Sequence, residues 1–272
     1  MVVVVPLRFS SAGVGGRRLS FYREFPPSAG LSTVVQCTWE GVPGWARALR
    51  VLPDGCVDIA WDGQRLFVSA GFVATRVPLS ASGTSVGVRL RCGAAGGLLG
   101  PGFASAGAVA DLHDLISAGA RIRADLDAAP TATAQRGVLE RFVARRLRAG
   151  FAPDPAMPVV VCGLAVPDAR VDGVADQVGL SARTLRRRVH AAVGCGPKEL
   201  HRVLRFHRFL RRLGDLTAGH TTLSSLAAGL GFADQSHLGH ECLRLSGSSP
   251  ARLMASYARH TDLAETNQTA TS

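Results

Sequence analysis

The chain has 272 residues and a formal net charge of +11, with a sequence isoelectric point near 10.7. This length suits two domains that each bury a core of their own, and the basic excess is typical of a protein that binds a polyanion. No apolar run approaches the about 18 residues of a membrane span, and Pro6 interrupts the valines that follow Met1. We therefore expect a cytoplasmic protein without a membrane partner.

The first domain is expected to be rich in β structure. Residues 1–16, with their Gly and Ser, are predicted to be a disordered extension, and β structure follows from residue 17 to about residue 104. Apolar residues alternate from Cys56 to Trp61, and Asp62-Gly63 is a two-residue turn signal. Further strands are predicted at residues 34–39, 66–68, 72–77 and 86–91. The pattern predicts a small sandwich or barrel.

Two helices are expected to follow the strands, at residues 108–120 and 135–149, so that this domain covers residues 17–149. The second helix has an apolar stripe, formed by Leu139, Phe142, Val143 and Leu147. Such a stripe suits packing onto the β structure as well as it suits a dimer interface. Residues 150–158 contain three prolines and are predicted to be a linker.

The rest of the chain contains one helical unit twice. Gly179 of the first copy corresponds to Gly231 of the second at an offset of 52 residues, and Gly194 corresponds to Gly247 at an offset of 53. The extra residue falls at a turn, where an insertion leaves the helices on both sides in phase. Each copy is typical of a helix-turn-helix, and Pro197 opens a further helix between them.

The second helix of each unit is predicted to present polar side chains that suit DNA. Arginine can donate two hydrogen bonds to guanine, and glutamine can bond adenine in the same two-point way, in the major groove. Charge runs are more often a solvated face, but the duplication favours DNA. The candidate DNA-binding residues are Ser181, Arg183, Arg186, Arg187, Arg188, Gln235, Ser236, His237 and His240.

Three segments within about the last 100 residues resemble the AraC-type (AraC/XylS family) DNA-binding domain: residues 180–188, 231–238 and 247–250. The resemblance implies an all-α domain at residues 159–258, in which a linker helix holds two helix-turn-helix units on successive major-groove segments. The chain departs from the family at Val189 and Cys242, where phenylalanine is common, and at His240, where arginine is usual. Residues 259–272 are predicted to be a disordered tail.

A pattern in the first domain resembles an uncharacterised cupin-like domain that is often fused ahead of AraC-type modules. It consists of Tyr22, Trp39, residues 52–58, Arg89 and Gly93. Within it, Asp54 and Asp58 flank a turn and are candidates for binding an effector, although Asp-Gly turns usually exist for backbone reasons.

The sequence offers little for chemistry. The first 170 residues contain one histidine, His113, and the six cysteines have no metal-ligand spacing, so we expect no metal, no cofactor and no catalytic site. The cysteines are expected to be buried or incidental thiols, with a thiol-based sensor as the alternative.

The sequence therefore predicts an α+β protein: a β-rich sandwich-like or barrel-like domain with trailing helices, then an all-α domain of two helix-turn-helix units. The predicted function is a transcription regulator that binds double-stranded DNA and is not an enzyme. A small-molecule effector, a second copy in a homodimer and RNA polymerase are the other partners considered, and nucleoid association is expected on DNA. The alternative is a small-molecule-binding or enzymatic β domain with an accessory DNA-binding tail.

Overall fold

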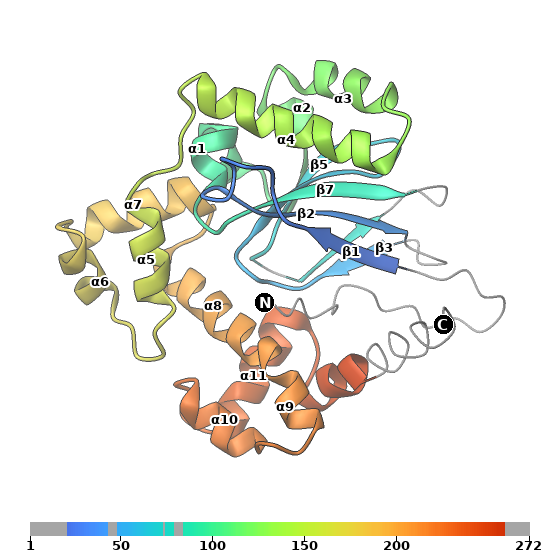
Figure 1. Ribbon diagram of the computed structural model, residues 1–272. Helices are drawn as coiled ribbons and strands as arrows, with labels where there is room; N and C mark the ends of the chain where they lie inside the picture. Colours follow the sequence, from blue (N-terminus) through green and yellow to red (C-terminus); the bar gives the residue numbers. More distant parts are fainter. Residues whose placement is uncertain (1–20, 43–47, 73, 79–83, 259–272) are drawn as a thin grey trace, which may run out of the picture.

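The structure is a computed structural model, and it describes residues 21–42, 48–72, 74–78 and 84–258. The predicted disordered segments, residues 1–16 and 259–272, lie outside the described residues. Figure 1 shows a β-rich part with helices across one face, and a helical part that begins after α4. The predicted α+β class and the order of its two parts are confirmed.

A six-stranded antiparallel sheet forms the centre of the first part, with strand order β1-β2-β7-β4-β5-β8. A separate two-stranded ribbon pairs β3 with β6. The strands are β1 (Phe21–Phe25), β2 (Val35–Val42), β3 (Ala48–Val51), β4 (Val57–Trp61), β5 (Leu66–Ala70), β6 (Thr75–Pro78), β7 (Ser85–Leu90) and β8 (Val109–Asp111).

The sheet is covered on both faces because its central strands alternate. Val57, Ile59 and Trp61 of β4 belong to a core shared with the helices, whereas Ala60 of the same strand belongs to a smaller core with Val51 and Val77 of the ribbon. In place of two sheets of similar size, the predicted sandwich has one large sheet. A two-stranded ribbon packs on one face of this sheet, and helices pack on the other.

Two local predictions need correction. The predicted helix at residues 108–120 begins instead as an edge strand, β8, followed by α2 (Leu112–Leu115) and α3 (Gly119–Asp127). Between β4 and β5 the loop covers residues 62–65, since Trp61 pairs with Leu66. The Asp62 carboxylate accepts hydrogen bonds from the backbone N–H groups of Gln64 and Arg65 at 3.0 and 2.8 Å, which centres the turn one residue later than predicted.

Helices α1 (Ala95–Leu99) and α4 (Ala132–Arg148) lie on the helical face of the sheet, and the short 3-10 helix η1 (Pro101–Ser105) follows α1. Val138, Leu139, Phe142 and Val143 of α4 are buried in the core that α4 shares with the sheet. The predicted apolar stripe is thus used for packing within the chain, which was one of the two alternatives.

The helical part consists of α5 (Met157–Leu164), α6 (Val171–Gln177), α7 (Ala182–Val193), α8 (Pro197–Arg211), α9 (Leu213–Thr217), α10 (Leu223–Gly229), α11 (Gln235–Ser246) and a last helix over residues 250–258. Here α6 with α7 and α10 with α11 are the two predicted units. The one-residue difference in offset lies in their turns, because α10 begins 52 residues after α6 and α11 begins 53 residues after α7.

The two parts pack against each other. Helix α1 contacts α7 so closely that a Cβ on Gly96 would clash with the carbonyl oxygen of Ala191. On the other unit, the backbone N–H of Ala74 donates to the carbonyl of Leu245 in α11 at 3.1 Å. Each helix-turn-helix unit therefore has its own contact with the β-rich part.

Candidate nucleic-acid interface

The turns of the two units have matching hydrogen bonds. The N–H of Leu180 donates to the carbonyl of Ala175 at 2.9 Å, and the N–H of Phe232 donates to that of Ala227 at the same distance. The preceding glycines, Gly179 and Gly231, have φ values of +65° and +74°, which a residue with a Cβ rarely adopts. The repeated sequence thus corresponds to a repeated backbone conformation.

Helix α7 begins at a side-chain cap. The Ser181 hydroxyl accepts a hydrogen bond from the N–H of Thr184 at 3.2 Å, and the left-handed Gly194 ends the helix. Leu185 and Val189 are fully buried, whereas Arg183, Arg186 and Arg187 are exposed. The exposed arginines leave the first turns of α7 available to a polyanion.

Arg188 lies apart from the other arginines. It is half-buried, and its Nε donates to the Asp154 carboxylate at 2.5 Å. Its guanidinium lowers the pKa of Asp154, so the carboxylate stays charged at neutral pH. Arg188, a candidate DNA-binding residue, therefore fastens α7 to the predicted linker.

Helix α11 repeats the arrangement with different polar groups. The Asp234 carboxylate caps it by accepting from the N–H of His237 at 2.7 Å. Gln235, Ser236 and His240 are exposed. His237 is half-buried because its ring contacts Phe232 edge-on, at 5.5 Å between centroids, and its Nδ1 accepts from the N–H of Ala233 at 3.2 Å.

Helix α8 belongs to the cores of both units. Leu200 and Leu204 pack with the first unit, and Val203, Phe206 and Leu210 pack with the second. Apolar residues at spacings of three and four from two starting points give α8 two apolar faces. The second helix of each unit, α7 or α11, is its recognition helix. Both recognition helices are consequently held by α8.

Polar contacts add to this support. Arg202 of α8 pairs with Glu241 of α11 at 2.9 Å between Nε and Oε2, and lowers the pKa of that carboxyl. Arg205 donates to the carbonyl of Gly231 at 2.7 Å, and Arg208 donates to that of Ala165 at 2.5 Å. This use of the α8 arginines was not predicted from the sequence. Glu241 could have indicated such a pairing, because a carboxylate on the buried stripe of α11 needs a cationic partner.

Residues 174–256 match a helix-turn-helix domain family, and residues 23–106 match a domain of unknown function, DUF6597. The first match covers both units described above. The C-terminal domain is an AraC-type helix-turn-helix domain. The prediction of an uncharacterised domain ahead of the AraC-type domain is confirmed as well.

No curated protein matches the chain. Among solved structures, crystal structures of ToxT from Vibrio cholerae resemble it weakly. One has a TM-score of 0.41 at 12% identity, covering 76% of this chain and 88% of that chain. A second has 0.43 at 10% identity, covering 88% and 98%. A third, titled as bound to an unsaturated fatty acid, has 0.40 at 13% identity, covering 75% and 88%.

The DUF6597 domain has a buried polar network between the sheet and the ribbon. Arg89 donates to Asp58 at 3.1 Å, to Glu24 at 2.7 Å and to the Tyr22 hydroxyl at 3.0 Å, and the Trp39 indole donates to Asp58 at 3.0 Å. Burial alone would lower the pKa of Arg89, but the nearby Asp58, Tyr22 and Asp54 together outweigh burial and raise that pKa. Four residues of the cupin-like pattern are thus partners in one network.

The two predicted effector residues are both held by hydrogen bonds within the protein. Asp58 is buried in the network. Asp54 accepts from the N–H of Cys56 at 2.9 Å, in a turn that packs on the AraC-type domain through Gly55, near Leu200 and Leu204. The structure therefore gives both aspartates structural partners.

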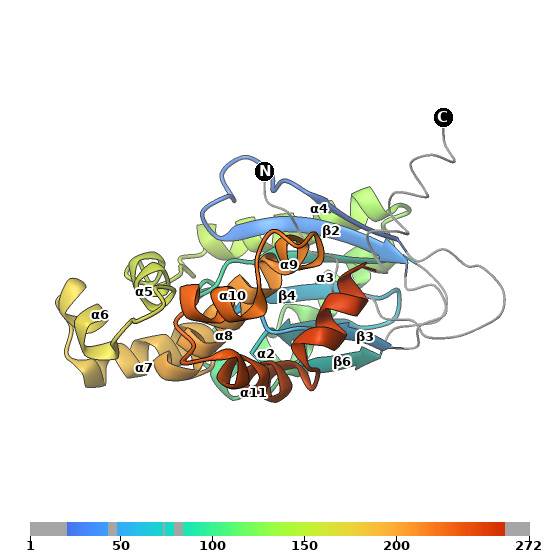
Figure 2. The same ribbon diagram turned by 90° about the horizontal axis from the view of Figure 1, so that it is seen from below.

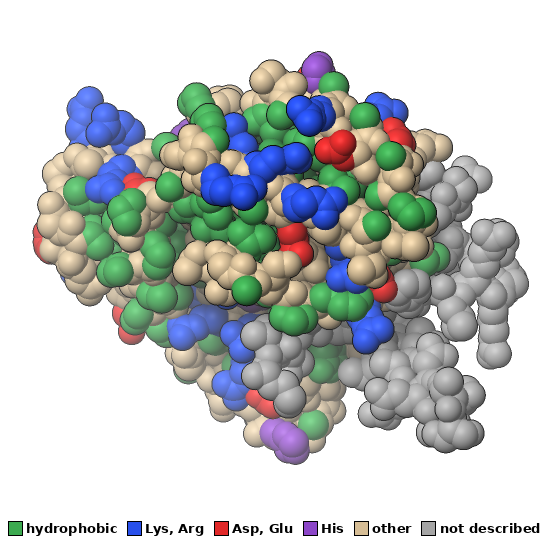
Figure 3. Space-filling view, turned by 45° about the horizontal axis from the view of Figure 1, so that its top comes forward, with side chains coloured by type: hydrophobic (Ala, Val, Ile, Leu, Met, Phe, Trp, Pro, Cys, Tyr) green, Lys and Arg blue, Asp and Glu red, His purple; other side chains and the backbone are tan. Residues whose placement is uncertain are grey.

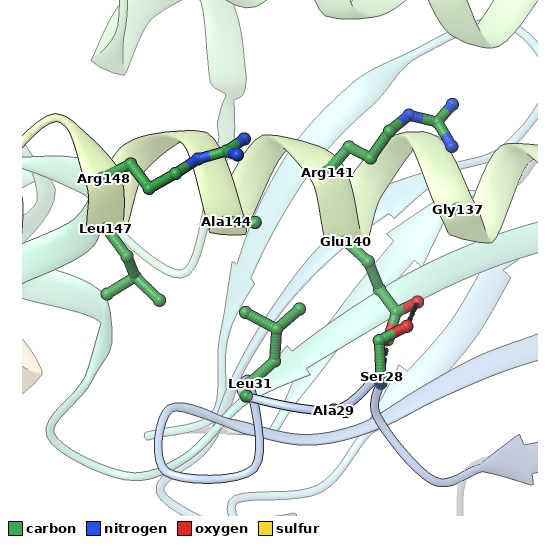
Figure 4. Close-up of a pocket in the computed structure, with 10 residues that line it drawn as sticks. Ser28, Ala29, Leu31, Gly137, Glu140, Arg141, Ala144, Leu147 and Arg148 are labelled. Carbon is green, nitrogen blue, oxygen red and sulfur yellow. Dashed lines mark hydrogen bonds between the residues drawn. The ribbon is translucent and has the colours of Figure 1, made fainter.

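An open pocket lies elsewhere in the DUF6597 domain, between residues 28–31 and α4, with a volume of about 440 Å³. Leu31 and Leu147 face each other across it, and the Glu140 carboxylate accepts from the Ser28 hydroxyl at 2.6 Å (Figure 4). Arg141 and Arg148 line it from α4. Figure 3 shows arginine and hydrophobic side chains close together on the helical face.

The described cysteines form no disulfide. Burial raises the pKa of Cys37, Cys195 and Cys242 to about 12, so these thiols stay protonated at neutral pH. Within the described ranges, no group of three or more His, Cys, Asp or Glu is placed to hold a metal ion. No described helix has the length and apolar character that a membrane crossing requires.

Proposed function

We propose that this protein is a sequence-specific transcription regulator whose two recognition helices bind neighbouring major-groove segments of one DNA site. One observation carries the proposal. Two capped helices, α7 and α11, present exposed polar side chains while α8 is buried in the cores of both units. Figure 2 shows α7 and α11 along the same edge of the molecule. One duplex along that edge reaches both helices.

The exposed residues divide by chemistry. Arg183, Arg186 and Arg187 suit guanine edges or phosphates, and Gln235 suits adenine. Ser236, His237 and His240 add donors and acceptors along the same helix. The remaining two candidates receive structural roles in this proposal: Ser181 caps α7, and Arg188 holds the linker through Asp154.

Replacing Arg183 or Gln235 with alanine is expected to reduce discrimination at particular base pairs by about 1–3 kcal/mol, because each loses a two-point contact. The preferred site is first selected from random duplexes with the wild-type protein. Competition by single-base variants of that site then measures discrimination. Arg121→Ala, an exposed arginine on α3, is the matched control and should leave discrimination unchanged. A uniform loss of affinity for every sequence would contradict the assignment.

We propose that the DUF6597 domain responds to an effector, and we assign the effector site to the pocket beside α4. Its apolar side chains, Leu31 and Leu147, suit a hydrocarbon or aromatic body. Arg141 and Arg148 have no ion-pair partner among the described residues and suit an acidic group. The effector class is therefore a small amphipathic anion.

The fluorescent anion 8-anilinonaphthalene-1-sulfonate is a probe for this assignment. The double variant Arg141→Gln, Arg148→Gln is expected to bind the probe at least ten-fold more weakly than wild type, since both cationic partners are lost. The double variant Arg121→Gln, Arg123→Gln on α3 removes the same charge away from the pocket. Equal affinity of the wild type and both double variants for the probe would contradict the assignment of the effector site to this pocket.

The proposed regulator has no catalytic activity, and it acts in the cytoplasm, as predicted. Neither a homodimer nor a contact with RNA polymerase is needed for the proposed function. The alternative is an enzymatic or small-molecule-binding β domain with an accessory DNA-binding tail. In that case the tail binds DNA without preference for a base sequence. A full-length protein that binds selected and scrambled duplexes equally at about 0.15 M salt would favour that alternative, because only charge would then drive binding.

A further inference from the structure

A cleft lies where the DUF6597 domain meets the second helix-turn-helix unit. Its volume is about 500 Å³, and it is lined by β6, the C-terminal end of α11 and the last helix. Each of these elements contributes one arginine: Arg76, Arg244 and Arg252. The described residues that line the cleft include no carboxylate. The cleft is therefore positively charged.

Two of the three charges are available to a ligand. Arg76 and Arg252 are exposed and have no carboxylate partner in the described part of the chain. Arg244 lies 3.9 Å from Glu241, but that carboxylate is already bound by Arg202. The cleft thus keeps a net positive charge that an anion can neutralise.

The cleft continues the exposed face of α11. Ser236, His240, Leu243 and Gly247 follow one another at spacings of four, three and four, which places them on one side of the helix. Leu243 is 50% exposed at the border of the cleft. A helix in the major groove has a phosphate strand on either side, so the end of its DNA-facing side lies near a backbone phosphate.

The strand that carries Arg76 is fixed beside α11. The hydrogen bond from the N–H of Ala74 to the carbonyl of Leu245 joins the two domains one residue before β6 begins. Figure 2 shows β6 on the same edge of the molecule as α7 and α11. Arg76 therefore lies on the side that the proposed function turns toward DNA.

We propose that this cleft binds a DNA backbone phosphate, so that the DUF6597 domain itself contacts DNA beside the second recognition helix. The inference rests on the proposed function and adds a partner for Arg76, Arg244 and Arg252. It also gives the first domain a direct effect on DNA binding, since any movement of β6 away from α11 withdraws Arg76.

The test is a salt series on the full-length protein with its selected duplex and with a scrambled duplex. Arg76→Gln is expected to weaken binding to both duplexes by the same factor. Loss of one phosphate contact lowers the salt slope by about 0.9, so the affinity lost between 0.05 and 0.2 M salt shrinks by a factor of about 3.5. Arg252→Gln should behave alike, and Arg121→Gln on α3 should match wild type.

A wild-type slope in both Arg76→Gln and Arg252→Gln would overturn this inference. The proposed function would survive that result if Gln235→Ala still lost base preference. A free anion is the other source of the same chemistry, and inorganic phosphate at constant ionic strength is its probe. Stabilisation of wild type by phosphate that disappears in Arg76→Gln, together with an unchanged DNA slope, would make the cleft a free-anion site and overturn the assignment to DNA.

Discussion

Replacing Arg89 with methionine is expected to destabilise the DUF6597 domain by about 3–5 kcal/mol, because it leaves the Asp58 and Glu24 carboxylates without their cation. The Arg89 side chain is only 4% exposed, and it is the shared donor of the network. Trp39, Trp45 and Trp61, the tryptophans of the chain, all lie in this domain. Urea unfolding followed by tryptophan fluorescence therefore measures the loss where it occurs.

The pH dependence of the variant separates this cause from a simple packing defect. Without Arg89, burial is expected to raise the pKa of Asp58, so the carboxyl is protonated in the folded protein at mildly acidic pH. A raised folded pKa favours folding at low pH and loses that contribution as pH rises. The penalty in Arg89→Met should thus shrink between pH 7 and pH 4. Arg145→Met, which removes an exposed ion pair with Asp125, should change stability by less than about 0.5 kcal/mol. A comparable loss in both variants would contradict the role of the network.

Gly96→Ala is expected to separate the DUF6597 domain from α7. An alanine inside a helix usually stabilises it by about 1 kcal/mol relative to glycine. At this position the new Cβ would overlap the carbonyl oxygen of Ala191, which is backbone and cannot turn aside. We therefore expect a loss of about 1–3 kcal/mol from overpacking.

Two measurements detect the separation of the DUF6597 domain from α7. Proteolysis of the linker at residues 150–158 should become about five-fold faster or more, and small-angle scattering should show a larger radius of gyration. Gly137→Ala in α4 is the matched control, since its Cβ would meet only the flexible end of Arg141, and it should stabilise the protein slightly. A more stable Gly96→Ala protein with unchanged proteolysis would show that α1 and α7 do not depend on this contact.

The helix-turn-helix units could be predicted because their signals are local. Turn glycines, capping residues and the buried stripes of α7 and α11 all fall within about 20 residues of one another, and the duplication states them twice. The helix predicted at residues 108–120 was wrong for a non-local reason. Val109–Asp111 form a strand because the edge of β5 offers them hydrogen-bonding partners, which the sequence between them does not reveal.

The partners of charged residues were the least predictable part of the site. Asp58 interrupts an apolar strand, and the sequence made it a candidate for binding an effector, with a backbone role at the turn as the alternative. Its partner, Arg89, is 31 residues away, and Arg188 finds Asp154 across 34 residues. Such pairs depend on how elements meet in space. Three candidate residues of α11, by contrast, are exposed as predicted, because helical periodicity alone places Gln235, Ser236 and His240.

The double burial of α8 limits the DNA sites that this protein can use. A helix of 15 residues is about 22 Å long, and here its two apolar faces are embedded in separate cores. One unit cannot rotate or slide relative to the other without breaking a packed core. The spacing between the two contacted segments is therefore an inflexible property of the operator. A half-turn insertion between them would place the second segment on the far side of the duplex, beyond the reach of α11.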